Sequence, residues 1–308
     1  MKKQNDTLWK GILEPFFFDF LKLIDPDLAA TVDSAREIVF MDKELNQRTP
    51  SAEEIYEQRI VDKLVKLYTL EGKEKWILIH LEIQEKYSRD FSERMYAYFN
   101  RLYDKYKKPI TAYAIFTEPN NIKRDNVFKM NCYGTTLHYT FNTYKIAVQD
   151  DNVLIQHPNP FALVILIAKA TALKKKYKNK LEYDQMLLAN KLQLAELILE
   201  RQLSPEKEQI IMNFLFYYVN FEFQETKITF EKKINLLTKK NNTEMTIQEI
   251  IIGQEKLKAK RLALKEAKED EITRLIRKQG LTDEQIVEFA EAPISLVKRV
   301  RKRTERIT

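Results

Sequence analysis

The chain has 308 residues and a net charge of +7, which allows one large domain or two ordinary ones and permits, without requiring, a polyanionic partner. One cysteine and three widely spaced histidines exclude a disulfide framework and argue against a thiolate or histidine zinc site. The N-terminus lacks the apolar run of a signal peptide, and the longest apolar stretch, residues 161–168, is too short to cross a bilayer. We therefore expect a soluble, cytoplasmic protein with no membrane partner.

The first elements in the chain are predicted to be helical. Apolar residues recur at helical spacing over residues 7–24, and Pro15 is expected to kink this helix or divide it in two. Asp25-Pro26-Asp27 should end the helical stretch. A strand is expected over residues 38–45, before a polar loop that contains Pro50.

Residues 59–84 are predicted to form a β-hairpin. Its two arms, residues 59–68 and 76–84, are rich in β-branched and other apolar residues. Glu71-Gly72-Lys73 between them supplies a turn, which we expect to be centred on the glycine.

That register has a direct consequence for two acidic residues of the hairpin. It places Asp62 opposite Glu82, and it puts both on one face with His80 and Gln84, because side chains alternate along a strand. A turn of four residues would instead place Asp62 opposite Ile83 and separate the two carboxylates.

The rest of the first half alternates helix and strand. An amphipathic helix is expected over residues 88–106 and a strand over residues 110–116. Strand, helix and strand in this order imply a right-handed crossover to a parallel neighbour. Further strands over residues 127–133 and 137–147 are expected to complete a mixed sheet, so the first half is predicted to be α/β.

The second half is predicted to be all-α. Ser204-Pro205 is a typical helix start, and residues 282–285 have the pattern of a capping box. A break at residues 291–293 precedes a strongly basic helix over residues 294–303. The other helices are expected over residues 161–173, 181–201, 205–221, 226–237 and 247–278.

The hairpin acids suggest a chemistry. Two carboxylates this close repel each other unless a cation or a proton lies between them. Mg²⁺ is a hard ion that prefers oxygen ligands, and it can activate water and stabilise the charge that develops on a phosphodiester. Gln84 would be placed to orient that water, although an amide supplies no positive charge. The alternative is that Asp62 and Glu82 are strand-end residues on a solvated face.

Several short motifs, which follow one another in the expected order along the chain, resemble those of the PD-(D/E)XK nuclease superfamily. The resemblance is strongest to its branch of recombination-promoting nucleases and transposase-related proteins. The resemblance covers roughly residues 6–118, with looser likeness to the end. The motifs are Asp6-Thr-Leu-Trp-Lys10, Phe40-Met-Asp-Lys-Glu-Leu45, Arg59-Ile-Val-Asp-Lys-Leu-Val65, Trp76-Ile-Leu-Ile-His-Leu-Glu-Ile-Gln84, Asp90-Phe-Ser-Glu-Arg-Met95 and Tyr103-Asp-Lys-Tyr-Lys-Lys-Pro-Ile110.

The resemblance implies a mixed-sheet, restriction-endonuclease-like core that cuts DNA with Mg²⁺ or Mn²⁺. Asp62 and Glu82 match the two metal-binding carboxylates of the superfamily, and the backbone carbonyl of Ile83 would be a further ligand. Gln84 stands at the usual lysine position, a departure that this branch shares. These residues are our predicted metal and catalytic site.

The end of the strand signals near residue 159 and the charge of the tail suggest a division of the chain. Residues 1–158 would be the nuclease core, and residues 159–245 a helical extension that packs on or beside it. Residues 246–308 would hold a charged helix and a small tail that resembles a helix-turn-helix.

Other residues near the predicted site have alternative roles. Lys63, Lys66 or Lys86 could supply the positive charge that Gln84 lacks, and Lys66 has the parity to share the face of the aspartate. Glu14 could match the first-helix acid of many superfamily members, although it stands beside a proline; otherwise it is an ordinary exposed helix residue. His80 is expected to be a packed residue or a hydrogen-bond partner of the ligands.

Basic residues are candidates for DNA contact. Those on or just after the predicted helix 88–106 would meet phosphates or line a solvated face: Arg94, Arg101, Lys105, Lys107 and Lys108. In the tail we expect docking on DNA through Lys298, Arg299, Lys302 and Arg303, the alternative being a basic tail with nonspecific phosphate affinity.

Three functions follow from these observations. The leading hypothesis is a Mg²⁺-dependent DNA endonuclease linked to recombination or a mobile element. The second is a DNA-binding protein that keeps the nuclease fold but has little catalysis, which Gln84 motivates. The third is a defence effector that cuts RNA or invading DNA. The helical half could bury a homodimer interface or form an extended arm of a monomer.

Overall fold

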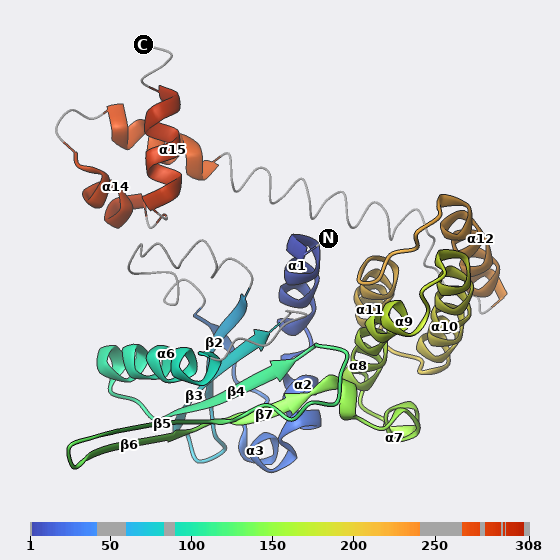
Figure 1. The fold of residues 1–308 in the computed structure, drawn as a ribbon, viewed down its shortest axis with the longest axis horizontal. Helices are drawn as coiled ribbons and strands as arrows, with labels where there is room; N and C mark the ends of the chain where they lie inside the picture. Colours follow the sequence, from blue (N-terminus) through green and yellow to red (C-terminus); the bar gives the residue numbers. More distant parts are fainter. Residues whose placement is uncertain are drawn as a thin grey trace. The chain divides into compact units, whose positions relative to one another are not determined.

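The computed structural model describes residues 2–41, 60–82, 90–240, 267–277, 281–290, 292 and 294–304. The chain divides into two compact units (Figure 1). The first holds Met1–Asp42 and Arg59–Ile247, and the second holds Lys43–Gln58 and Gln248–Thr308.

The first unit begins with three helices. α1 (Lys2–Leu13) and α2 (Phe17–Ile24) are separate helices, which confirms the division predicted at Pro15. Asp25 follows α2, and its carboxylate accepts a hydrogen bond from the first turn of α3 (Pro26–Thr31). The predicted end of the helical stretch is therefore also the N-cap of a new short helix.

A five-stranded mixed sheet forms the centre of the first unit, which confirms the α/β class. The strand order is β1-β2-β3-β4-β7; β1, β2 and β3 are antiparallel neighbours, whereas β3, β4 and β7 run parallel. The strands are β1 (Val39–Phe40), β2 (Ile60–Tyr68), β3 (Glu74–Glu82), β4 (Ile110–Phe116) and β7 (Asn142–Lys145).

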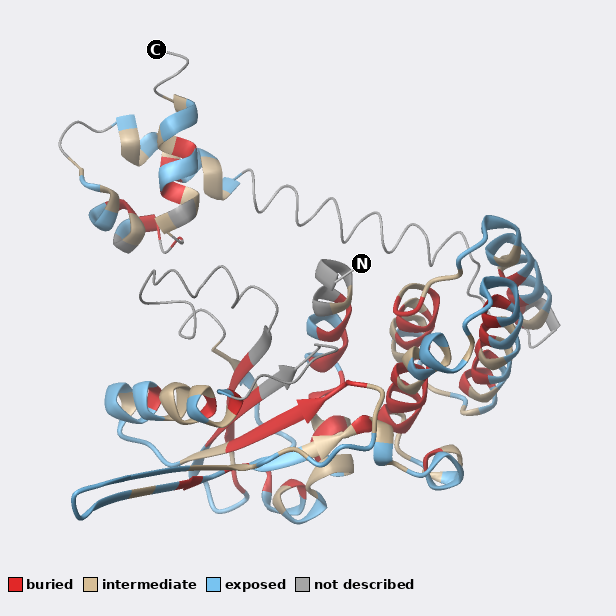
Figure 2. Cartoon of the chain, viewed as in Figure 1, coloured by how far each residue is buried: buried red, intermediate tan, exposed pale blue. Residues whose placement is uncertain are grey.

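Helices cover both faces of this sheet (Figures 1 and 2). α6 (Phe91–Tyr106) connects β3 to β4 and packs on one face, where the Phe91 and Phe116 ring centroids are 5.1 Å apart. On the other face the hydroxyl of Tyr113 donates a hydrogen bond to the Asp25 carboxylate between α2 and α3. The middle of the sheet is consequently buried on both sides.

The sequence prediction for residues 127–147 was only partly right. β5 (Val127–Cys132) and β6 (Thr135–Thr140) pair with each other in a separate two-stranded sheet, and only the later β7 joins the main sheet. Most residues of the ribbon are exposed, and its paired aromatic residues Phe128 and Tyr139 pack against Tyr96 of α6 instead of against another strand of the main sheet. The chain passes from the ribbon to β7 at Phe141, which is 3% exposed.

The rest of the first unit is helical, as predicted. All residues of Phe161–Ala168 are buried, so this helix forms part of the core of the unit. Trp9 of α1 packs edge-on against Phe214 at 5.2 Å, which joins the helical half to the N-terminal helices. The elements are η1 (Ile146–Val148), α7 (Asp151–Gln156), α8 (Phe161–Lys169), η2 (Ala170–Ala172), α9 (Leu173–Lys176), α10 (Lys180–Glu200), α11 (Pro205–Tyr217) and α12 (Gln224–Lys240).

Two local features of this half compare directly with the sequence prediction. Ser204 caps α11, because its hydroxyl accepts a hydrogen bond from the backbone N–H of Lys207. α7 was not predicted; its six residues are too few for a clear helical period, and its main signal is the capping residue Asp150.

The second unit has its own small core. Residues 267–277 are helical and are followed by α14 (Asp283–Ala290) and α15 (Ile294–Thr304). The predicted capping box is confirmed: the Thr282 N–H donates to the Gln285 side chain at 2.9 Å, and the Gln285 N–H donates to the Thr282 hydroxyl at 3.3 Å. The buried core residues are Ile272, Ile286, Ala290, Ala292, Val297 and Val300. In the described part of the chain, no helix is both long and apolar enough to span a membrane.

Candidate functional site

The hairpin of β2 and β3 carries the two predicted metal ligands in a register that differs by two residues from the prediction. Asp62 lies opposite His80, and Glu82 lies opposite Ile60. The expected direct pairing of Asp62 with Glu82 was therefore wrong. Because the shift is two residues and side chains alternate with a period of two, the positions of Asp62 and Glu82 still share one face, as diagonal neighbours.

The turn explains the shift. The Gly72 N–H donates to the Thr69 carbonyl at 2.8 Å, so the glycine is the fourth residue of the turn and Glu71 is the midpoint of the hairpin. Gly72 has a φ of +80°, in the left-handed region that glycine adopts without a steric penalty. The predicted turn residue is thus correct, but its place in the turn is one position later than expected.

The shared face of Asp62 and Glu82 is the face that α6 covers. Glu82 pairs in register with Phe116 of the parallel strand β4, and the Phe116 ring contacts Phe91 in the first turn of α6. The end of β3 at Glu82 therefore lies towards the N-terminal end of this helix. Arg94 lies in the same turn, with its guanidinium 5.7 Å from the centre of the Phe91 ring and its Nε 3.9 Å from the Asp90 carboxylate.

The ligand set itself is placed by strand register alone. The side chains of Asp62, His80 and Glu82, and the whole of Ile83 and Gln84, lie outside what the structure describes. Two carboxylates at diagonal positions on one face are hard oxygen donors of the kind that Mg²⁺ prefers, so the residues present fit the predicted ion. Elsewhere, among the described side chains, no three His, Cys, Asp or Glu residues gather as a metal site.

Lys63 and Glu14 do not belong to this face. Lys63 is the odd-numbered neighbour of Asp62, so it projects to the opposite side of the sheet, where it is 1% exposed and forms an ion pair with Glu14. Glu14 lies in the turn between α1 and α2 and is half-exposed. The structure therefore places Lys63 and Glu14 on the side of the sheet opposite the Asp62 and Glu82 positions.

Lys66 shares the face of Asp62, as its parity predicted, but it lies too far along the strand. It is opposite Trp76, four residues or about 13 Å from Asp62. Its ammonium lies 5.8 Å from the centre of the Tyr68 ring, farther along the strand. Lys86, the third lysine considered, lies outside the described residues.

The other basic residues at the C-terminal end of α6 have partners within the protein. Lys107 pairs with Asp104 at 2.6 Å and Lys108 with Glu74 at 3.1 Å. The Arg101 guanidinium lies 5.8 Å from the Tyr98 ring centre, and the Lys105 ammonium lies 4.9 Å from the Tyr106 ring centre. These contacts favour a solvated helix face for this end of α6, which is the opposite end of the helix from Arg94.

The predicted DNA contacts of the tail fall into two pairs on α15. Arg299 and Arg303 both contact the Glu269 carboxylate, at 3.3 Å and 2.9 Å. Lys298 and Lys302 are exposed and form no ion pair within the described residues. The two lysines are thus the residues available to phosphates without breaking a contact.

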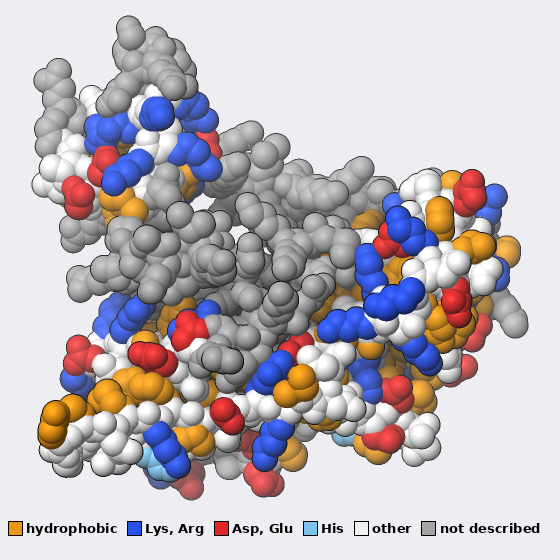
Figure 3. Space-filling view, in the orientation of Figure 1, with side chains coloured by type: hydrophobic (Ala, Val, Ile, Leu, Met, Phe, Trp, Pro, Cys, Tyr) orange, Lys and Arg blue, Asp and Glu red, His pale blue; other side chains and the backbone are white. Residues whose placement is uncertain are grey.

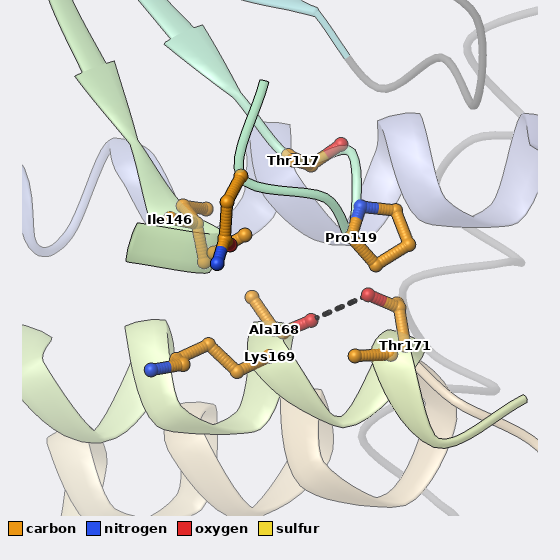
Figure 4. Close-up of a pocket in the computed structure, with 9 residues that line it drawn as sticks. Thr117, Pro119, Ile146, Ala168, Lys169 and Thr171 are labelled. Atoms are coloured by element: carbon orange, nitrogen blue, oxygen red, sulfur yellow. Dashed lines mark hydrogen bonds between the residues drawn. The ribbon is translucent and has the colours of Figure 1, made fainter. Parts of the chain in front are cut away.

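A cavity of about 100 Å³ lies between the loop after β4 and α8 (Figure 4). Thr171 of its lining already donates a hydrogen bond to the Ala168 carbonyl at 2.9 Å. Lys169 donates to the Gln149 carbonyl and pairs with Asp151. Because these polar groups are engaged within the chain, the cavity offers little for binding a polar ligand.

A second charged group follows β4 and was not anticipated. Glu118 is 3% exposed and accepts hydrogen bonds from Arg124 at 2.5 Å, Lys145 at 2.8 Å and Asn120 at 3.1 Å. Burial alone would raise its pKa, but the hydrogen bonds from Arg124 and Lys145 outweigh burial and lower the pKa to about 2. The group joins the loop after β4 to β7, and its members are too far apart in the sequence to suggest it.

The geometry brings the Asp62 and Glu82 positions onto one face, with Arg94 at the end of α6 beside them. It separates Glu14, Lys63 and Lys66 from them. Searches of protein-family models, curated proteins and solved structures found no match to this chain.

Proposed function

We propose that this protein is a Mg²⁺-dependent DNA endonuclease, linked to recombination or a mobile element as in the family that it resembles. The observation that carries the proposal is the register of β2 and β3, which gives Asp62 and Glu82 diagonal positions on one sheet face. The resemblance of the motifs supplies the reaction class, the hydrolysis of a phosphodiester bond.

Each residue of the proposed site has a separate task. Asp62, Glu82 and the backbone carbonyl of Ile83 would hold the metal, which when bound would lower the pKa of a water and stabilise charge on the phosphate. The amide oxygen of Gln84 accepts a hydrogen bond from the attacking water and orients it towards the phosphorus. Mn²⁺ would fit the same oxygen ligands.

Arg94 is proposed to supply the positive charge that Gln84 lacks. It lies in the first turn of α6, next to the strand end that carries Glu82, and its side chain is 22% exposed. A guanidinium can donate two parallel hydrogen bonds to phosphate oxygens. Arg94 would therefore bind the scissile phosphate or its neighbour.

Cleavage of supercoiled plasmid tests the proposal, with Glu82→Gln as the variant and Glu74→Gln as its control. Both glutamates belong to β3 and share its face by parity, but Glu74 is at the far end, paired with Lys108. We expect wild type and Glu74→Gln to cut with Mg²⁺ or Mn²⁺, and Glu82→Gln to lose at least about 100-fold in rate. Wild-type cleavage by Glu82→Gln would refute the proposal.

A DNA-binding protein with little catalysis is the second candidate. It is favoured by Gln84 at the lysine position and by the engagement of Lys63 with Glu14 on the other side of the sheet. In that case purified wild type would retard duplex DNA in a gel and leave plasmid uncut with either metal. Metal-dependent nicking by wild type would exclude this candidate.

A further inference from the structure

Five lysines lie within seven residues at α9 and the turn that follows it. The sequence Lys174-Lys-Lys-Tyr-Lys-Asn-Lys180, here called the lysine segment, carries all five, and each is exposed. Figure 3 shows Lys and Arg side chains gathered over this part of the first unit.

The lysine segment is only weakly neutralised within the described part of the chain. Glu222 pairs with Lys174 at 2.6 Å and with Lys180 at 3.8 Å, which ties both ends of the segment to one acid. The hydrogen bond from Lys174 lowers the pKa of Glu222, so this acid stays ionised. We call Lys175, Lys176 and Lys178 the central lysines; none of the three forms an ion pair with a described residue.

The segment also borders a hollow in the surface of the first unit. Its volume is about 140 Å³, and its lining consists of Lys174, Tyr177, Lys178, Lys180, Tyr183 and Glu222. The Lys174 ammonium lies 5.9 Å from the centre of the Tyr183 ring, and that of Lys176 lies 5.3 Å from the Tyr177 ring. These ion pairs and ring contacts limit the freedom of Lys174, Lys176 and Lys180, which reduces the entropy that these three side chains lose on binding.

We propose that the lysine segment binds the phosphate backbone of duplex DNA at a place separate from the Asp62–Glu82 site. That the polyanion is DNA rests on the proposed function. Lysine ammonium groups act as point charges that contact phosphates without reading base edges, so the contact is independent of sequence. The segment has no aliphatic residue, whereas a membrane-binding surface needs an apolar face to insert.

Equilibrium binding of a fluorescent duplex by the full-length protein in EDTA tests this inference. The variant is Lys175→Gln, Lys176→Gln and Lys178→Gln together. The control replaces three exposed lysines elsewhere in the first unit, Lys22, Lys232 and Lys233, by glutamine, which changes the net charge equally.

Loss of three phosphate contacts should reduce the slope of log affinity against log salt by about 2.7, and should weaken binding at least about tenfold at 0.1 M salt. The control should keep the wild-type slope. Circular dichroism confirms that both variants are folded. A slope in the central-lysine variant equal to that of the control would overturn the proposal.

Two further measurements keep this result separate from the proposed function. Binding of the same proteins to vesicles that contain phosphatidylserine is measured in parallel. If the central-lysine variant loses binding to the vesicles but keeps its affinity for the duplex, the proposal is also overturned. Plasmid cleavage by the central-lysine variant is the second measurement, and it should still depend on Mg²⁺ or Mn²⁺, because the Asp62–Glu82 site is unchanged in this variant. If the cleavage test fails, the result for the lysine segment is therefore unaffected. If the lysine-segment test fails, the proposed endonuclease activity is unaffected.

Discussion

Lys63 is a charged residue in the packed layer between β2 and the turn that joins α1 to α2. Its side chain is almost fully buried, and its ion pair with Glu14 lies on the side of the sheet opposite Asp62. An ammonium in such a place is costly unless it is paired, so Glu14 stabilises the fold at this point. The sequence alone offered both residues as parts of the active site, because neither a shared face nor burial is visible in their spacing.

Glu14→Gln separates the two roles of this acid. We expect it to lower the free energy of unfolding by about 1–2 kcal/mol, since the variant removes the charge that pairs with a buried ammonium while the amide remains half-exposed. Metal-dependent cleavage below the unfolding transition should be unchanged. Urea unfolding and the plasmid assay measure the two effects, and a loss of cleavage with unchanged stability would place Glu14 in the active site.

The hairpin shows how much of an element can be predicted from its sequence. The apolar arms and Gly72 correctly indicated two antiparallel strands and the turn, but not which turn position the glycine takes. The period of two kept Asp62 and Glu82 on one face despite the shift. In β5 and β6 the local pattern again predicted strands, but sheet membership depends on burial by distant residues and could not be predicted.

α10 holds the connection between α11 and α12 through two buried charged residues. The Lys191 ammonium donates to the carbonyls of Leu215 and Phe216 at 2.7 Å and 3.1 Å, near the C-terminal end of α11. The Asp184 carboxylate accepts hydrogen bonds from the N–H groups of Glu222 and Phe223, just before α12. One helix thus satisfies backbone groups at both ends of this connection.

Lys191 should make stability depend on pH. Burial, with a smaller contribution from Lys227, lowers its pKa from 10.5 to about 7. Between pH 7 and 10.5 the unfolded state keeps a proton that the folded state has released, so stability should rise with pH by up to about 1.4 kcal/mol per unit. Urea unfolding at pH 7 and 9 measures the rise, and Lys191→Met should remove that part of it. An equal rise in the variant would contradict this assignment.

At the scale of the whole molecule, the order of elements was predictable and their long-range packing was not. The sequence correctly indicated an α/β first half and a helical second half. Contacts such as Trp9 with Phe214, and Phe20 with Phe161, join the N-terminal helices to α8 and α11 within the first unit. Such contacts connect residues more than 100 positions apart and leave no periodic pattern in the sequence.

The second unit has a core of its own, so it should lose its structure without unfolding the first. Val297 is fully buried in that core, and Val297→Asp would place an unpaired carboxylate there. We expect hydrogen exchange to lose protection in residues 283–304 and to keep it in α8. Loss of protection in both places would show that the two units unfold together.

Binding of Mn²⁺, followed by electron paramagnetic resonance, tests whether the β2–β3 hairpin holds a metal ion. We expect one site in the wild type, which Asp62→Asn and Glu82→Gln each weaken strongly, because each removes an anionic ligand. Glu14→Gln and Glu74→Gln should bind Mn²⁺ as the wild type does, since Glu14 lies on the opposite side of the sheet and Glu74 at the far end of β3. Equal Mn²⁺ affinity in all five proteins would contradict a metal site on the β2–β3 hairpin.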